Sequence, residues 1–183
     1  MNDFKHRLSN LIARVVIWKS DNTKKTQEVQ ISIQKDEVRN AQRFQEYGFC
    51  SVPLTNAEGI AIFAGGFRDR PFVIATEDRR YKPTTWLDGE VGLYAFEGDY
   101  VRLKNGRIVE VVSGVKVDVT APDVVVHAST KVRLETPMLE VTGEIKDRCD
   151  SDGKTMEQMR NVYNSHTHNE TGTVTNAPNQ SMG

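Results

Sequence analysis

Residues 115 to 141 carry a short apolar repeat that restricts the folds open to this chain. Within the repeat, apolar and polar side chains alternate, as they do along strands with one buried face. A unit of two apolar residues separated by one other residue recurs from Val117 to Val124, Val132 and Leu139, at intervals of seven, eight and seven residues. The spacers lack the Asn-Gly and Asp-Gly pairs that favour tight hairpins, so a simple meander is disfavoured.

A strip with one apolar row cannot form a core alone, because each repeat of a solenoid buries its face only by stacking against another surface. Three copies around a threefold axis would cover the row, with the charged row in water and no long free strand edge. The sequence therefore predicts a narrow, rigid prism made of three copies of this part of the chain. A short sheet of an ordinary sandwich is the alternative.

The aromatic residues divide the chain near residues 104–107. Both tryptophans, all seven phenylalanines and four of the five tyrosines precede this point, and only Tyr163 follows it. A globular core therefore fits the first part, where short β-like stretches separated by Gly or polar clusters predict an OB-like barrel over residues 13–104 of an all-β protein. The expected strands are Arg14–Trp18, Gln27–Gln34, Phe49–Pro53, Ile60–Ala64, Pro71–Ala75, Val91–Phe96 and Tyr100–Lys104, with one or two helical turns in Asp36–Tyr47.

Two further helices are expected. Phe4, Leu8 and Ile12 share one helical face, which predicts an amphipathic helix over residues 1–12. This helix is either a docking element for a partner or a cap on its own domain. A second short helix is expected over Thr155–Tyr163, after a break at Asp152–Lys154.

The last segment, residues 147–183, contains the sequence His166-Thr167-His168. In an extended chain, side chains two residues apart point the same way, so both imidazoles can face one point. Two histidines make a poor metal site, but three chains around one axis would supply six imidazole nitrogens, and imidazole suits iron, nickel or cobalt. The alternative is a polar tail whose histidines bind nothing.

Several functional classes find little support in the sequence. The formal net charge is −1 and the pI about 6.4, so there is no overall basic surface for nucleic acid. Glycine-rich phosphate loops and nucleophile motifs are missing, so we expect no enzyme. A metal-dependent hydrolase acting on envelope or nucleic acid, and an OB-type nucleic-acid binder, are the competing hypotheses. The isolated Cys50 and Cys149 favour synthesis in a reducing cytoplasm, and no apolar run approaches the roughly 18 residues of a membrane span.

Four segments together carry a family resemblance. They are Val73–Tyr81, Gly89–Tyr94, Gly98–Val111 and Asp152–His168, with the valine repeats between the last two. In this order, ending in His-Thr-His, they resemble the baseplate assembly protein V family of contractile-tailed phages, especially the phage Mu type. The likeness covers nearly the whole chain.

The resemblance implies a homotrimeric central spike at the tip of the virion's tail baseplate, which pierces the host outer membrane when the sheath contracts. It implies an N-terminal OB-like domain bound to a baseplate hub protein, an intertwined, trimeric triple-stranded β-helix over residues 105–146 and a pointed apex, with no nucleic-acid partner. By this resemblance His166 and His168 of each chain would hold one iron ion per trimer. Calcium and chloride near the tip are also implied, with no residue of this chain matched to them, and no catalytic residue is expected.

Overall fold

The computed structural model describes residues 11–34, 37–69 and 71–182. The chain divides into two compact units, residues 1–120 and 121–183. The amphipathic helix expected over residues 1–12 falls almost entirely outside the described residues, and Ile12 itself begins a strand. In the described ranges no helix is long and apolar enough to cross a membrane.

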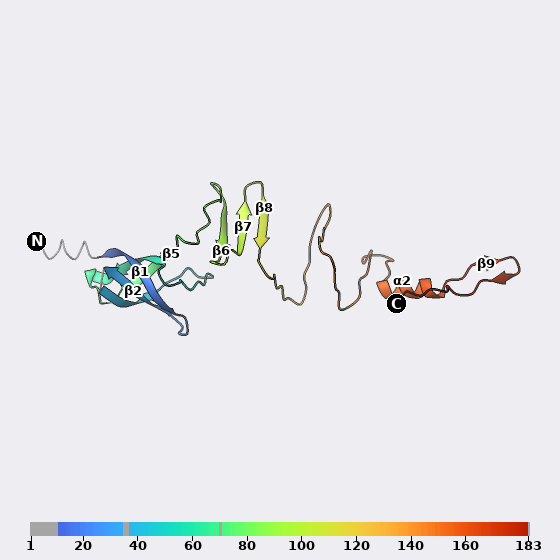
Figure 1. The fold of residues 1–183 in the computed structure, drawn as a ribbon, viewed down its shortest axis with the longest axis horizontal. Coiled ribbons are helices and arrows are strands. Elements are labelled where there is room, and N and C mark those ends of the chain that lie inside the picture. The colour runs from blue at the N-terminus through green and yellow to red at the C-terminus, as the bar shows by residue number, and fades with distance from the viewer. Residues whose placement is uncertain (1–10, 35–36, 70, 183) are drawn as a thin grey trace, which may run out of the picture. The chain divides into compact units, whose positions relative to one another are not determined.

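Five strands of the first unit close into a barrel in the order β1-β2-β3-β5-β4, with β4 paired back to β1 (Figure 1). All neighbouring strands are antiparallel except β3 and β5, which pair in parallel. This confirms the predicted all-β class and N-terminal barrel. The strands are β1 (Ile12–Asp21), β2 (Gln27–Gln34), β3 (Glu37–Arg43), β4 (Glu58–Phe63) and β5 (Pro71–Glu77), and a short 3-10 turn, η1 (Ala64–Gly66), follows β4.

The barrel interior holds the hydrophobic core of the described chain. Alternate residues of each strand point inward, so apolar side chains from all five strands meet there. Phe63 is the largest of them and is fully buried. No hydrophobic residue described after Val73 is buried, so the later segments lack a core of their own in the single chain. The core residues are Val15, Ile17, Val29, Ile31, Ala41, Ala57, Ala61, Phe63 and Val73.

Two local predictions were wrong. The segment Asp36–Tyr47 was expected to form helical turns, but residues 37–43 form β3, which pairs with β2 on one side and β5 on the other. The hydrogen bonds that β3 forms with a strand on each of its edges outweigh the helical preference of individual residues in this segment. Phe49–Pro53 was expected to form a strand and instead belongs to the loop between β3 and β4.

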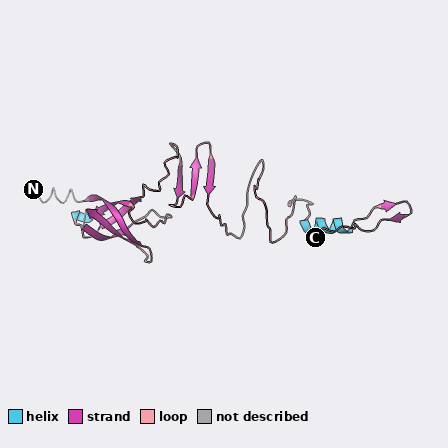
Figure 2. Ribbon diagram, viewed as in Figure 1, coloured by secondary structure: helices cyan, strands magenta, loops and turns pink. Residues whose placement is uncertain are grey.

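A separate antiparallel sheet follows the barrel in the order β6-β7-β8 (Figure 2). Its strands are β6 (Val91–Tyr94), β7 (Tyr100–Lys104) and β8 (Ile108–Val112). Gly98 and Gly106 adopt positive φ angles in the two turns, a backbone state that glycine enters at little cost. The boundary expected between residues 104 and 105 falls in the turn between β7 and β8.

The two faces of this sheet differ in chemistry. On one face Trp86 covers Gly92, where an added Cβ would lie 2.6 Å from the indole ring, and the Arg102 guanidinium lies 5.3 Å from the ring centroid of Trp86. The opposite face is wholly aliphatic, because strand register aligns its residues across the three strands. We call this face the aliphatic sheet face; its residues are Val91, Leu93, Val101, Leu103, Val109 and Val111.

The second unit contains little regular structure. Residues 121–144 form neither helix nor strand, and an isolated bridge between Lys146 and Thr155 precedes helix α2 (Met156–Ser165). The helix matches the one expected over Thr155–Tyr163. A small hairpin of β9 (Asn169–Glu170) and β10 (Thr173–Val174) follows (Figure 2).

Candidate metal centre at the C-terminal histidine pair

Helix α2 delivers the histidine pair. The helix begins with a capping box, in which the Thr155 hydroxyl accepts from the Gln158 backbone N–H at 3.2 Å and the Gln158 side chain accepts from the Thr155 N–H at 3.0 Å. The helix ends at Ser165, and His166 has extended backbone angles. The histidine pair therefore starts at a fixed point, directly beyond the last helical turn.

The ring of His166 is held by the end of the helix. Its Nδ1 lies 2.6 Å from the carbonyl oxygen of Tyr163, and the ring centroids of Tyr163 and His166 are 5.4 Å apart. A carbonyl only accepts hydrogen bonds, so Nδ1 carries the proton and the lone pair of Nε2 is left free. Metal-binding histidines commonly have this arrangement, in which the second ring nitrogen donates to a backbone carbonyl or carboxylate.

The structure brings the two predicted site residues together. The imidazole centroids of His166 and His168 are 5.2 Å apart with the rings nearly perpendicular, so one ion could contact both rings. The backbone N–H of His168 donates to the Thr175 hydroxyl at 2.7 Å, and the Thr175 N–H donates to the His168 carbonyl at 2.9 Å. The sequence analysis identified neither Thr175 nor the Tyr163 carbonyl as a partner of the histidines. For Thr175 the available signal was Gly172, which marks the turn that brings the chain back beside His168.

A cavity of about 530 Å³ adjoins the rings, with Thr175, Asn176 and Asn179 among its lining residues. No group of three or more histidine, cysteine or acidic side chains that could hold a metal occurs in the described part of the chain. One chain therefore supplies two imidazoles, which fit an imidazole-preferring ion by chemistry but leave most of its coordination positions to other groups.

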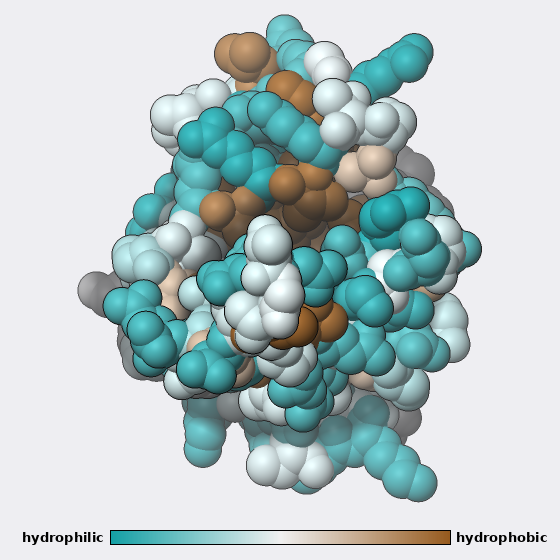
Figure 3. Space-filling model, turned by 90° about the vertical axis from the view of Figure 1, so that its right-hand side faces the viewer, coloured by the Kyte–Doolittle hydropathy of each residue, from teal (hydrophilic) through white to brown (hydrophobic). Residues whose placement is uncertain are grey.

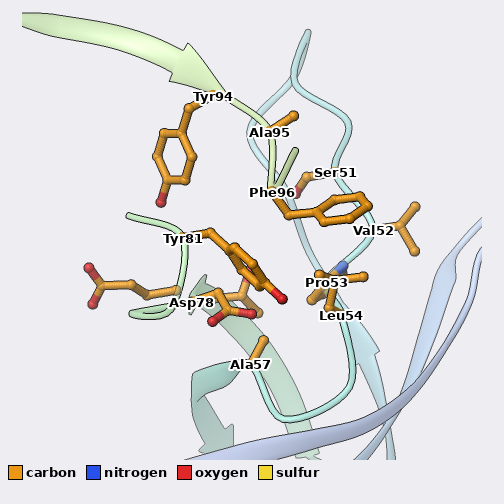
Figure 4. Close-up of a pocket in the computed structure, with 12 residues that line it drawn as sticks. Ser51, Val52, Pro53, Leu54, Ala57, Asp78, Tyr81, Tyr94, Ala95 and Phe96 are labelled. Atoms are coloured by element: carbon orange, nitrogen blue, oxygen red, sulfur yellow. The ribbon is translucent and has the colours of Figure 1, made fainter. Parts of the chain in front are cut away.

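The first unit has a second candidate site, a pocket of about 320 Å³ (Figure 4). Its walls come from the β3–β4 loop, the turn after β5 and the segment after β6. The Tyr81 and Phe96 rings meet edge to face with centroids 5.8 Å apart. A hydrogen bond from Arg80 lowers the pKa of the neighbouring Asp78 carboxyl, so the acid at the rim is ionised and paired. The apolar walls are formed by Val52, Pro53, Leu54, Ala57, Tyr81 and Phe96.

These features define an all-β protein with an N-terminal barrel, a small sheet with one uncovered aliphatic face and a histidine pair near the C-terminus. A family model described as Bacteriophage Mu Gp45, N-terminal, matches residues 14–80, a range that contains the barrel strands from β2 to β5. The chain is 33% identical over 142 residues to the baseplate puncturing device gp45 of Escherichia phage Mu, covering 76% of this chain and 68% of that protein.

A second relative is the Mu-like prophage FluMu protein gp45 of Haemophilus influenzae. It is 28% identical over 143 residues, covering 77% of this chain and 76% of the relative. The chain belongs to the Mu gp45 family of phage baseplate spike proteins, which confirms the resemblance drawn from the sequence.

Proposed function

We propose that this protein is the central spike of a contractile phage tail baseplate, formed by three copies of the chain. Its relative in phage Mu is named a baseplate puncturing device, which supports a place in the virion's tail. Sheath contraction would drive the spike through the host outer membrane. This task is mechanical, so it requires a stiff rod and no bond-breaking active site.

The observation that carries the proposal is the uncovered aliphatic surface. The residues of the aliphatic sheet face are 40–65% exposed, although they form a continuous patch across three strands. Monomeric proteins rarely leave a large contiguous apolar patch in water. Two further copies presenting the same face around a threefold axis would cover it. Apolar side chains are also visible among hydrophilic ones on the surface shown in Figure 3.

The valine repeat supports the same arrangement. Residues 115–141 form no strand in the single chain, and their apolar side chains are all exposed. Backbone N–H and C=O groups are paired in nearly all buried segments, so a buried repeat requires another chain as its ladder partner. Two sister chains would supply both the ladder and the apolar cover, which gives the triple-stranded β-helix expected over residues 105–146.

At the apex, three copies would bring six imidazoles to one axis. His166 and His168 of each chain would then hold one ion, for which we propose iron, with calcium or chloride bound elsewhere near the tip. The bound ion would cross-link the three chain ends and contribute its binding energy to folding. In the single chain, the Tyr163 carbonyl already orients the His166 ring with Nε2 free.

Native mass measurement combined with elemental analysis tests the assembly and the ion together. The expected particle has three times the 20.6 kDa chain mass and about one iron per three chains. A monomer that binds a metal with a coordination position open to water would instead favour the metal-dependent hydrolase. A monomer without metal would contradict the spike.

A double substitution, His166→Ala with His168→Ala, tests the ligands. We expect the iron to be lost while the particle remains three chains, because the aliphatic contacts lie elsewhere. His127→Ala is the matched control, since His127 is an exposed histidine in the valine repeat. Iron content unchanged in the double variant would refute the assignment of the two ligands.

The apolar pocket of the first unit is the proposed docking point for a baseplate hub protein. It is open, and Val52, Leu54 and Phe96 expose apolar atoms at its mouth. Val52→Asp should weaken incorporation of the spike into baseplates, because a charge would be buried on docking. Val38→Asp, at an exposed position of β3 outside the pocket, should incorporate normally. Equal incorporation of both variants would contradict the docking point.

A further inference from the structure

The segment after the histidine pair returns to it. The β9–β10 hairpin pairs Thr173 with Glu170 and Val174 with Asn169, so the next position places Thr175 opposite His168. The backbone bond from the Thr175 N–H to the His168 carbonyl, at 2.9 Å, extends this ladder and could be made by any residue except proline. The Thr175 hydroxyl adds a bond that only a suitable side chain can make, because it accepts from the His168 N–H at 2.7 Å.

A second contact fastens the end of this segment. The Asn164 side chain, near the end of α2, accepts from the Met182 N–H at 2.8 Å and donates to the Met182 carbonyl at 3.2 Å. Residues 175 and 182 are thus both attached to the neighbourhood of the histidines. Between them, residues 176–179 line the cavity beside the imidazoles. The segment from Thr175 to Met182, which we call the return segment, therefore forms one wall of that cavity.

We propose that Thr175 and Asn164 are positioning residues for the histidine pair. Neither would bind the ion. Thr175 fixes the backbone from which the His168 ring projects, and Asn164 keeps the return segment closed over the rings. This inference rests on the metal site of the proposed function. Hydrogen-bond partners that orient metal ligands typically change metal affinity by about 10–100-fold when they are removed.

Thr175→Val removes the hydroxyl and retains the β-branched shape. In the full-length protein we expect iron to bind about 10–100-fold more weakly in competition with a chelator. In the metal-free protein, the His168 amide should exchange its hydrogen faster, because its acceptor is gone. Thr175→Ser should restore both properties. Thr173→Val, which changes an exposed threonine of the same hairpin, should leave both unchanged.

Asn164→Ala provides an independent variant, because it cuts the other attachment of the return segment. We expect faster release of iron to the chelator, with the helix content retained. Iron affinity and release within twofold of the unsubstituted protein in both Thr175→Val and Asn164→Ala would overturn the positioning role and leave the metal site standing. Unsubstituted protein that binds no iron would overturn the metal site, and the positioning role with it.

Discussion

Two charged residues, Arg43 and Glu90, link segments of this protein through hydrogen bonds, in addition to the contacts made by hydrophobic burial. In the barrel, the Arg43 guanidinium donates to the Gln27 side chain, the Ser51 carbonyl and hydroxyl, and the Thr76 hydroxyl, which joins β2, β3, the β3–β4 loop and β5. Burial lowers the pKa of Arg43, and the bonds to neutral oxygens offset part of its lost hydration. The fixed donor geometry of a guanidinium suits this role, which a lysine could not fill.

Glu90 performs a similar task on the β6–β8 sheet. Its carboxylate accepts from Arg102 Nε and from the Leu87 N–H, both at 2.9 Å, and from the Asn105 N–H at 3.1 Å. The side chain is 2% exposed, and these donors, led by Arg102, lower its pKa from 4.5 to about 2. The bonds secure the segment that carries Trp86 over the sheet.

Acid should detach the segment that carries Trp86 from the β6–β8 sheet. Because the pKa of Glu90 is lower in the folded state than in the unfolded chain, its stabilisation is complete above about pH 4.5 and is lost as the pH falls towards 2. Trp86 fluorescence, recorded in a Trp18→Phe background, should therefore change within this range. Glu90→Gln should destabilise the protein at pH 7 and remove this part of the pH dependence.

Glu97→Gln is the control for the charge change, because Glu97 is exposed in the β6–β7 turn. It should leave the fluorescence transition in place. A transition that is identical in the Glu90→Gln variant would show that other carboxylates cause it. Sequence reasoning missed Glu90, because its partners Arg102 and Asn105 become neighbours only through strand pairing.

At the scale of elements, α2 depends on its first turn. A helix of ten residues is marginal in water by itself, and its residues bury little in the single chain. A Cβ at Gly153 would overlap the Asp147 carbonyl oxygen, so the entry loop also requires glycine. The capping box therefore largely determines where the helix starts. The position of the helix in turn sets the point from which the histidines project.

Thr155→Ala should cost about 1 kcal/mol of helix stability, because it removes the capping hydroxyl. The Gln158 amide, which donates to that hydroxyl, should exchange its hydrogen about fivefold faster. Thr171→Ala, in the β9–β10 turn, should leave the exchange of the Gln158 amide unchanged. An equal exchange rate of the Gln158 amide in the unsubstituted protein, Thr155→Ala and Thr171→Ala would show that the capping box contributes nothing to the helix.

The elements also show what alternation in the sequence can predict. β2, in which apolar and polar residues alternate, and β5, which begins with a continuous apolar run, lie where the sequence predicted them. β3 was missed because its inward residues are Ala41 and Arg43, which form no apolar stripe, and its strand state comes from pairing with β2 and β5. For residues 115–141 the pattern predicts strands whose partners would come from other chains, so the single chain leaves that prediction untested.

At the scale of the whole molecule, hydrophobic burial is unevenly distributed. The barrel has a closed core, and every apolar side chain described beyond it stays at least partly in water. Fully burying one leucine or valine stabilises an assembly by about 1.5–3 kcal/mol. The six side chains of the aliphatic sheet face, repeated in each copy, therefore offer a substantial drive towards association that does not depend on the ion.

Leu103→Asp tests this drive directly. Leu103 lies on the aliphatic sheet face and is 49% exposed, and Ile74 on the outside of the barrel is 51% exposed, so Ile74→Asp is a closely matched control. Light scattering should show three chains for the control and a lower mass for Leu103→Asp, because three carboxylates would face one another in an apolar interface. A full trimer for Leu103→Asp would place the contact between copies on another surface.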